Sequence, residues 1–193
     1  MSQPFVLVLY YSRHGSVLNL AKSIAKGIES VGVEARIRTV PELDQTRGDD
    51  APYPEVELSD VVECAGLAMG SPCHFGMMAS PLKYFWETTS TQWLRGDLID
   101  KPAAVFTSSS SLHGGNESTL LSMSLPLLHH GFMLLGVPYS VPELNSTNTG
   151  GTPYGASHVS GLSVTPDLSD DEKNVAMALG KRLARTSLAL IKN

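Results

Sequence analysis

Cysteines and long hydrophobic segments are both scarce in this sequence. Among its 193 residues the chain has two cysteines, Cys64 and Cys73, too few to stabilise a fold of this size by disulfides. We expect both thiols to be free, as in a reducing compartment. The longest apolar run, Phe5–Tyr11, is far shorter than the roughly 20 residues of a membrane-spanning helix, and no basic patch precedes it as in a secretory signal. These absences predict a cytoplasmic protein with no membrane partner.

Positive charge is also sparse. The chain has 14 Lys and Arg against 19 Asp and Glu, a formal net charge of −5, and its basic residues are scattered. Nucleic-acid-binding proteins usually present a basic face, so we expect no nucleic-acid partner. With 42% hydrophobic and 17% charged residues the composition is that of an ordinary globular protein, and the length predicts a single domain over residues 1–193.

Several catalytic and nucleotide-binding signatures are missing too. The sequence has no Gly-x-Gly-x-x-Gly of a Rossmann dinucleotide site and no Lys-Ser/Thr pair preceded by glycine as in a P-loop, which disfavours both classes. No Ser/His/Asp order indicates a hydrolase, and the carboxylates are not paired as a glycosidase requires. Cys73 and His74 are adjacent, but two ligands are too few for a metal site, and we predict no bound metal.

Short hydrophobic runs alternate with helical patterns along the chain. Phe5–Tyr11 is rich in β-branched and aromatic residues, as in a strand that is buried on both faces. After it, apolar residues from Leu20 to Ile28 recur at helical spacing up to Gly32. Further strands are predicted over Glu34–Val40, Gly66–Gly70, Ala103–Thr107 and Met133–Val137, and helices near Ser80–Thr88, near Ser118–His130 and from the capping-box sequence Ser169–Glu172 onward. Five strands alternating with helices predict a doubly wound α/β fold, with helices on both faces of a five-stranded parallel sheet.

Two segments lack such a pattern. Residues 41–57 contain three prolines and several acidic residues, which predicts an exposed loop. Residues 139–166 are rich in Gly, Pro, Ser, Thr and Asn and show little periodicity. So long an irregular segment in a compact domain is typical of a functional or interfacial region.

Three loops follow predicted strands, at the edge of the sheet where such folds bind their ligands. In Ser12–Val17, hydroxyl groups, one glycine and the free N–H groups of a helix start can surround a phosphate; the alternative is a plain connection with capping serines. Ser71–Met78 is either a turn that presents backbone groups to a flat heterocycle or a purely structural turn. Thr107–Glu117 is small and polar, and either follows the edge of a ring system or is a flexible connector.

Four segments taken together indicate a family. They are Val8–Gly15, Gly70–Gly76, Leu128–Gly131 and Gly150–Ala156. In these segments, and over nearly its whole length, the chain resembles the WrbA family of flavodoxin-like, FMN-dependent NAD(P)H:quinone oxidoreductases. The resemblance implies a flavodoxin-like fold, FMN as the cofactor, NADH or NADPH as co-substrate, a quinone as electron acceptor, and assembly as a homotetramer.

The resemblance also implies roles for individual residues. The FMN phosphate would bind to Ser12, Arg13, His14, Gly15, Ser16 and Val17; the ribityl chain and isoalloxazine would lie along Pro72, Cys73, His74, Phe75 and Gly76; the other ring edge would meet Ser108, Ser109, Ser110, Ser111, Leu112, His113 and Gly114. His129 would contact the flavin from a neighbouring subunit or the pocket wall, while Trp93 and His14 would contact the quinone or the nicotinamide nucleotide. No side chain receives a certain catalytic role, and His14, His74 and His130 are candidate proton donors near neutral pH.

The expected reaction passes a hydride from NAD(P)H to the flavin and then both electrons to a quinone on the same face, which predicts ping-pong kinetics. Two other functions stay open. One is a one-electron carrier of the flavodoxin type, although such carriers usually surround the flavin with acidic side chains and these loops carry hydroxyls and histidines. The other is a flavin-free interaction module, because Cys73, His74 and Met77 replace the family's common Thr, Arg and Asn.

Overall fold

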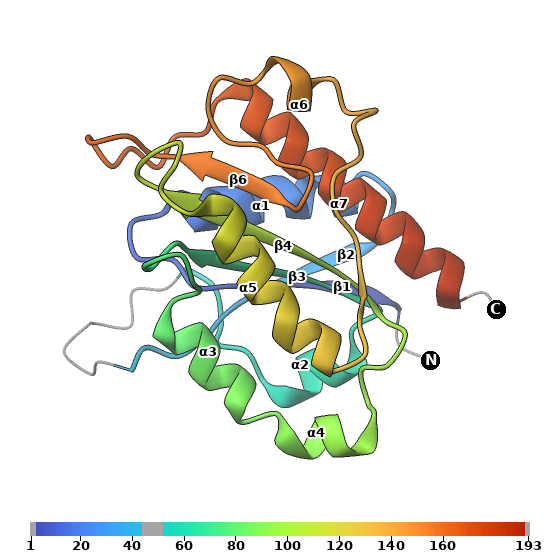
Figure 1. The fold of residues 1–193 in the computed structure, drawn as a ribbon. Helices are drawn as coiled ribbons and strands as arrows, with labels where there is room; N and C mark the ends of the chain where they lie inside the picture. The colour runs from blue at the N-terminus through green and yellow to red at the C-terminus, as the bar shows by residue number, and fades with distance from the viewer. Residues whose placement is uncertain (1–2, 44–51, 192–193) are drawn as a thin grey trace.

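A parallel β-sheet lies between two layers of helices (Figure 1). The computed structural model describes residues 3–43 and 52–191. Its strands are β1 (Phe5–Tyr10), β2 (Glu34–Thr39), β3 (Gly66–Pro72), β4 (Pro102–Ser109), β5 (Met133–Leu134) and β6 (Ala156–Val159). In the described chain the order is β2-β1-β3-β4-β5, the pairs are parallel, and β6 also pairs with β4. This order and the two helical layers confirm the predicted doubly wound, flavodoxin-like architecture.

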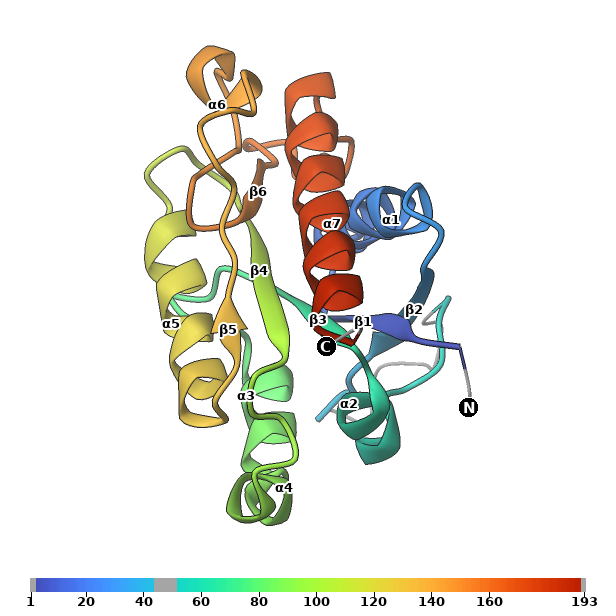
Figure 2. The same cartoon turned by 90° about the vertical axis from the view of Figure 1, so that its right-hand side faces the viewer.

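The helices divide between the two faces of the sheet. Figure 2 shows α1 (Ser16–Glu29) and α7 (Asp170–Ile191) together on one side. The other side carries α2 (Leu58–Glu63), α3 (Ser80–Glu87), α4 (Ser90–Arg95) and α5 (Asn116–His129), while α6 (Glu143–Ser146) precedes β6. The sequence did not predict α2, α4 or α6, because helices of one or two turns leave little periodicity. Within the described residues, no helix is long and apolar enough to cross a membrane.

Alternate residues of β1 face the two helical layers. Leu7 and Leu9 are fully buried in a core shared with α2, α3 and α5. Val6 and Val8 are fully buried in a second core, shared with α1 and α7. Burying such a side chain contributes about 1.5–3 kcal/mol. A strand with both faces covered has to be apolar at every position, which explains the uninterrupted hydrophobic run in the sequence.

Glycines let α1 and α7 approach each other closely. A Cβ at Gly27 of α1 would be 2.2 Å from the carbonyl oxygen of Met177, and a Cβ at Gly180 of α7 would be 2.2 Å from that of Ile24. No side chain fits between the two backbones at these points. The close contact fixes α7, and with it the loop that precedes α7, against α1.

Two short strands share the fifth position of the sheet, which corrects the prediction of one strand over Met133–Val137. β5 pairs with the start of β4, where Met133 lies opposite Pro102. The chain then leaves the sheet, Val137 N–H donates to Pro153 O (2.9 Å), and the chain returns as β6 beside the second half of β4. The predicted irregular segment 139–166 therefore contains a strand. β6 has four residues and two of them are polar, too little for a strand pattern to show.

The predicted exposed loop 41–57 packs against the sheet at its far end. Residues 44–51 lie outside the described residues. Thr39 N–H donates to Pro54 O (3.0 Å), and Val56 N–H donates to Thr39 O (2.8 Å). Val56 is buried, but most other described residues of the segment are exposed, as predicted. The loop is therefore exposed and is joined to the end of β2 by these two hydrogen bonds.

Candidate functional site

The three loops that follow β1, β3 and β4 meet beyond the carboxyl ends of these strands, on the left of Figure 1. They border a cavity of about 260 Å³. Its lining residues are Ser12, Arg13, His14, Ser16, Val17, Pro72, Cys73, His74, Ser108, Ser109, Ser110, Ser160 and Val164. Residues from all three predicted loops are therefore brought together at one site, and the loop after β6 adds two more.

Ser12 and Gly15 shape the first loop. Gly15 has a φ of 91°, a left-handed conformation in which a side chain would be strained, and it immediately precedes α1. The Oγ atom of Ser12 accepts hydrogen bonds from the N–H groups of Gly15 (3.2 Å) and Leu18 (3.3 Å). This hydroxyl therefore supports the tight turn from β1 into α1.

The start of α1 can bind an anion. Ser16 and Val17 line the cavity, and as first-turn residues their N–H groups have no partner within the helix. A helix N-terminus attracts negative charge, and Arg13 and the Ser16 hydroxyl stand beside it. These groups have the chemistry to bind a phosphate monoester such as that of FMN.

The second loop is a tight turn joined to the third loop. Cys73 N–H donates to Ser108 O (2.8 Å). His74 and Met77 bond to each other in both directions, His74 N–H to Met77 O at 2.9 Å and Met77 N–H to His74 O at 3.1 Å. Phe75, at the tip of this turn, has a φ of 55° and a fully exposed side chain. The turn therefore places a large aromatic ring in solvent beside the cavity.

Internal hydrogen bonds hold the third loop. Ser109 Oγ donates to Ser111 O (2.8 Å), and Gly114 N–H donates to the same carbonyl (3.0 Å). Gly115, which precedes α5, has a φ of 97°, and a Cβ there would lie 3.1 Å from Cys73 Sγ. These bonds give the loop a defined shape, unlike the flexible connector that the composition also allowed.

Arg13 supplies positive charge at the cavity. His14 also lines it, and among the described lining residues none carries a carboxylate. Partial burial, and then the charges of Arg13 and His14, lower the pKa of His74. His74 is therefore neutral near pH 7 and offers one N–H donor and one acceptor nitrogen to a ligand.

Gly15 shapes the first loop without lining the cavity, and the remaining predicted residues divide into two groups. Six lie in the second and third loops next to the cavity without lining it: Phe75, Gly76, Ser111, Leu112, His113 and Gly114. Trp93 and His129 lie elsewhere, where α4 meets the end of α5, and Trp93 Nε1 donates to His129 O (2.9 Å). Within one chain these two residues do not line the cavity, so the pocket-wall position considered for His129 is not found.

His130 is also remote from the cavity, which removes it as a proton donor within one chain. Its side chain is buried beside Trp86, with ring centroids 5.2 Å apart. Nε2 of His130 is 2.9 Å from Thr89 Oγ1, whose hydroxyl donates to Trp86 O. Because that hydroxyl proton is already used, the ring nitrogen donates. Burial, and then the charge of His129, lower the pKa of His130.

The loop after β6 was not assigned a role from the sequence. Ser160 and Val164 line the cavity, and Ser160 N–H donates to Ser109 O (2.9 Å). Asn19 Nδ2 donates to Pro166 O (2.9 Å), which fastens the same loop to α1. The irregular composition of 139–166 indicated a functional segment, but no pattern in it singled out these residues.

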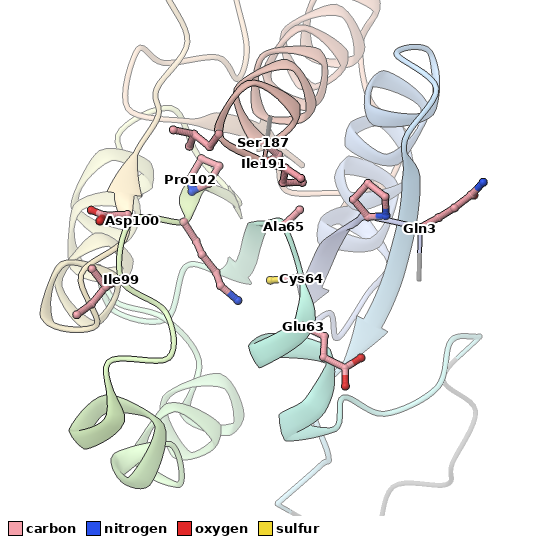
Figure 3. Close-up of a pocket in the computed structure, with 12 residues that line it drawn as sticks. Gln3, Glu63, Cys64, Ala65, Ile99, Asp100, Pro102, Ser187 and Ile191 are labelled. Carbon is pink, nitrogen blue, oxygen red and sulfur yellow. The ribbon is translucent and has the colours of Figure 1, made fainter. Parts of the chain in front are cut away.

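A second cavity, of about 350 Å³, lies at the amino ends of β1, β3 and β4 (Figure 3). Cys64 borders it but is buried, and its thiol donates to Val61 O (3.2 Å). Burial raises the pKa of this thiol to about 11, which makes it a poor nucleophile. Lys101 Nζ is held by Val62 O. None of the residues predicted to bind cofactor or substrate lines this second cavity.

Sequence comparison links the chain to known flavin enzymes. A model of the family described as NADPH-dependent FMN reductase matches residues 6–143. A protein of Chromohalobacter salexigens named NAD(P)H dehydrogenase (quinone) is 38% identical over 197 residues, which cover 96% of this chain and 98% of that protein. A protein of the same name from Gluconacetobacter diazotrophicus is 36% identical, with 96% of this chain and 98% of that protein covered.

Solved structures show the same fold. The flavodoxin, WrbA-like protein of Agrobacterium tumefaciens has a TM-score of 0.73 at 20% identity, covering 97% of this chain and 99% of that one. Oxidised flavodoxin 1 of Bacillus cereus has a TM-score of 0.61 at 15% identity, covering 93% of this chain and 97% of that one. At such identities the likeness shows the fold alone. With the sequence matches, it confirms the resemblance that the four sequence segments indicated.

Proposed function

The chain belongs to the NADPH-dependent FMN reductase family, and on that premise we propose that it is an FMN-dependent NAD(P)H:quinone oxidoreductase that reduces quinones by two electrons. The observation that carries the proposal is the hydroxyl-lined cavity, free of carboxylates among its described residues, at the start of α1. It occurs in a chain whose relatives, 38% and 36% identical over 96% of its length, are named for this activity.

The cavity supplies the groups that FMN needs. The first loop, Ser12–Val17, binds the phosphate through hydroxyls, backbone N–H groups and Arg13. The Pro72–Gly76 turn and the Ser108–Gly114 loop border the ribityl chain and the ring. When bound, FMN supplies a ring that takes up hydride from NADH or NADPH and gives up two electrons. The protein binds the flavin, orients it and polarises its ring. Neutral His74 is the side chain that would exchange a proton with it.

Nicotinamide nucleotide and quinone occupy the same place in turn. His14 and Arg13 stand at the cavity, where the Arg13 guanidinium can meet the phosphates of the nucleotide and the His14 ring can contact it. One binding place for two substrates gives ping-pong kinetics. In double-reciprocal plots of the initial rate against quinone concentration, the lines for several NADH concentrations should be parallel. Intersecting lines would exclude this order of binding.

The proposed activity is tested with the visible spectrum of the FMN-loaded protein. Anaerobic NADH should bleach the flavin absorption, and benzoquinone should restore it with stoichiometric loss of NADH. A protein that binds FMN but oxidises no NADH when benzoquinone is added would disprove the enzymatic function. Accumulation of a stable one-electron-reduced form would instead identify the carrier, and a protein that stays colourless with FMN would identify the flavin-free module.

A homotetramer completes the proposal. Trp93 and His129 are exposed and remote from their own chain's cavity, so they can serve the site of a neighbouring subunit. Between α5 and the edge of the sheet lies an apolar groove of about 320 Å³, lined by Leu121, Leu125 and Leu128, which are half exposed. Such a surface supports association. Sedimentation or light scattering measures the assembly directly.

We also propose that the protein is cytoplasmic, a compartment in which its two thiols stay reduced.

A further inference from the structure

A buried pair of opposite charges lies behind the cavity. His158 of β6 and Glu172 of α7 are each 1% exposed, and His158 Nδ1 is 2.9 Å from Glu172 Oε2. β6 brings His158 next to the cavity wall, because His158 is the register partner of Ser108 in β4. Neither residue is used by the cofactor or substrate contacts proposed above.

The surroundings of Glu172 fix it as a carboxylate. Oε1 accepts from the N–H groups of Gly150 (2.9 Å) and Val159 (3.0 Å), and Oε2 accepts from Ser169 N–H (2.8 Å). Glu172 N–H in turn donates to Ser169 Oγ (3.2 Å), which confirms the capping box predicted at the start of α7. Burial raises the pKa of Glu172, but these bonds and the one with His158 outweigh burial and lower it to about 2.

The surroundings of His158 fix it as an imidazolium. Nδ1 faces the carboxylate of Glu172, and Nε2 faces the carbonyl oxygen of Thr165 at 3.0 Å. Both partners are acceptors, and only the protonated ring donates from both nitrogens. Burial lowers the pKa of His158, but the bonds to Glu172 and Thr165 and the charges of Glu172 and Asp167 outweigh burial and raise it.

The carbonyl that His158 holds belongs to the 160–166 loop, which forms a wall of the cavity through Ser160 and Val164. Val164 has a φ of 51°, which strains a β-branched residue. Such a conformation persists only where neighbouring contacts impose it. A Cβ at Gly15 would lie 3.4 Å from Pro166 Cβ, so the end of this loop is in contact with the phosphate-binding turn.

We propose that the imidazolium of His158, held by Glu172, is a positioning residue that fixes the 160–166 loop as the wall of the FMN site, so that FMN is retained less tightly once His158 loses its proton. The proposal rests on the proposed function, because it takes the cavity to be the FMN site. A neutral ring would set a lone pair against one of its two acceptors. The Thr165 carbonyl is the acceptor on the strained loop, whereas Glu172 keeps its backbone donors.

The test compares the wild type with His158→Gln, whose amide donates from one end only. FMN dissociation constants are measured by quenching of flavin fluorescence from pH 7 to about pH 10. Since a hydrogen bond from a charged group is lost, we expect His158→Gln to bind FMN about tenfold more weakly at pH 7. The wild-type affinity should fall with rising pH toward that of the variant, while the variant's own profile stays flatter. Other groups that titrate in this range are common to both proteins.

A matched control is Ser157→Ala. Ser157 is the neighbouring buried residue of β6, and its Oγ accepts from Gly151 N–H (2.8 Å), away from the 160–166 loop. This variant should be destabilised yet keep the wild-type FMN affinity and pH profile. If both variants weakened FMN binding equally and with the same pH profile, His158 would be a purely structural residue and the proposal would be overturned.

A second measurement covers the case in which His158→Gln does not fold. In the wild-type apoprotein, hydrogen exchange of residues 160–166 should accelerate at alkaline pH by more than that of β1, which serves as the reference for base catalysis. Unchanged protection of residues 160–166 relative to β1 would overturn the proposal. The FMN titrations also separate two failures. A wild type that binds no FMN at any pH removes the proposed function, whereas FMN binding that is insensitive to pH and to His158→Gln removes only the role of His158.

Discussion

The thiol of Cys73 lies 3.0 Å from the carbonyl oxygen of Gly114 and donates a hydrogen bond to it. The bond joins the loop after β3 to the loop after β4 beside the cavity. Both loops border the proposed ring-binding part of the site, so their spacing is set in part by a side chain that the sequence marked only as unusual for the family.

We expect Cys73→Ala to widen the gap between these two loops. A thiol is a weak donor, so loss of this bond costs about 0.5 kcal/mol, the lower end for hydrogen bonds, which corresponds to FMN binding weaker by about twofold. Fluorescence titration with FMN measures the change. The control is Cys64→Ala at the opposite edge of the sheet (Figure 3), which should lower stability and leave FMN affinity intact. Equal FMN affinity in wild type and Cys73→Ala would show that the bond does not shape the site.

Gly15→Val should remove FMN binding. A valine at a φ of 91° is strained, and its branches would crowd Pro166 and the phosphate-binding turn. Gly32→Val is the matched control, because Gly32 has a φ of 83° but a Cβ added there would meet nothing within 4 Å. Both variants should lose stability in thermal unfolding, and Gly15→Val should lose more because of the added contact with Pro166. FMN retention after gel filtration should be lost in Gly15→Val alone, and a yellow Gly15→Val protein would contradict the placement of the phosphate.

The sequence predicted β1, β2, β3 and β4, and all of these except β2 are buried almost continuously. β1, β3 and β4 are covered on both faces, so each appears as an apolar run that no other element imitates. β6 was missed because Ser157 and His158 are buried with hydrogen-bond partners, which a hydrophobic pattern does not register. The break between β5 and β6 depends on the bond from Val137 to Pro153, a contact between distant residues.

The same distinction applies to the site. Loops that directly follow predicted strands were located correctly, because parallel strands bring their carboxyl ends to one edge of the sheet. Ser160 and Val164 were missed, since their loop follows the strand that the sequence did not reveal. Trp93 and His129 were singled out by family resemblance, and one chain places them together but away from the cavity. The sequence of one chain does not show which residues of other subunits would contact these two.

Stability should fall at acid pH as Glu172 takes up a proton. The pKa of Glu172 is about 2 in the folded chain against an ordinary 4.5, so its contribution is full above pH 4.5 and is lost as pH falls toward 2. A shift of this size corresponds to roughly 3 kcal/mol. Urea unfolding at pH 7, 4.5 and 3 should show the gap between wild type and Glu172→Gln narrowing as the pH falls. A constant gap would mean that Glu172 does not titrate as described.

Gly180→Ala should destabilise the protein without touching the cavity. The new methyl would stand 2.2 Å from the carbonyl oxygen of Ile24, and since that atom belongs to a backbone, the two helices have to separate. Overpacking of this kind typically costs about 1–3 kcal/mol. Lys181→Ala, one position along α7 and exposed, should change the unfolding free energy by less than about 0.5 kcal/mol. Thermal or urea unfolding compares the two variants, and equal stability would argue against the close helix contact.

Trp93 should affect the KM for the quinone only when subunits are assembled. If its indole reaches a neighbouring subunit's site, Trp93→Ala raises the KM for benzoquinone by several-fold and leaves FMN affinity unchanged, since Trp93 is not at its own chain's cavity. Leu125→Glu, in the apolar groove beside α5, should dissociate the tetramer and raise the same KM to a similar extent. Tyr84→Ala, which removes another half-exposed aromatic ring, serves as the control and should change neither quantity. Light scattering reports the assembly and steady-state kinetics report KM. A Leu125→Glu monomer with wild-type KM would show that each chain carries a complete quinone site.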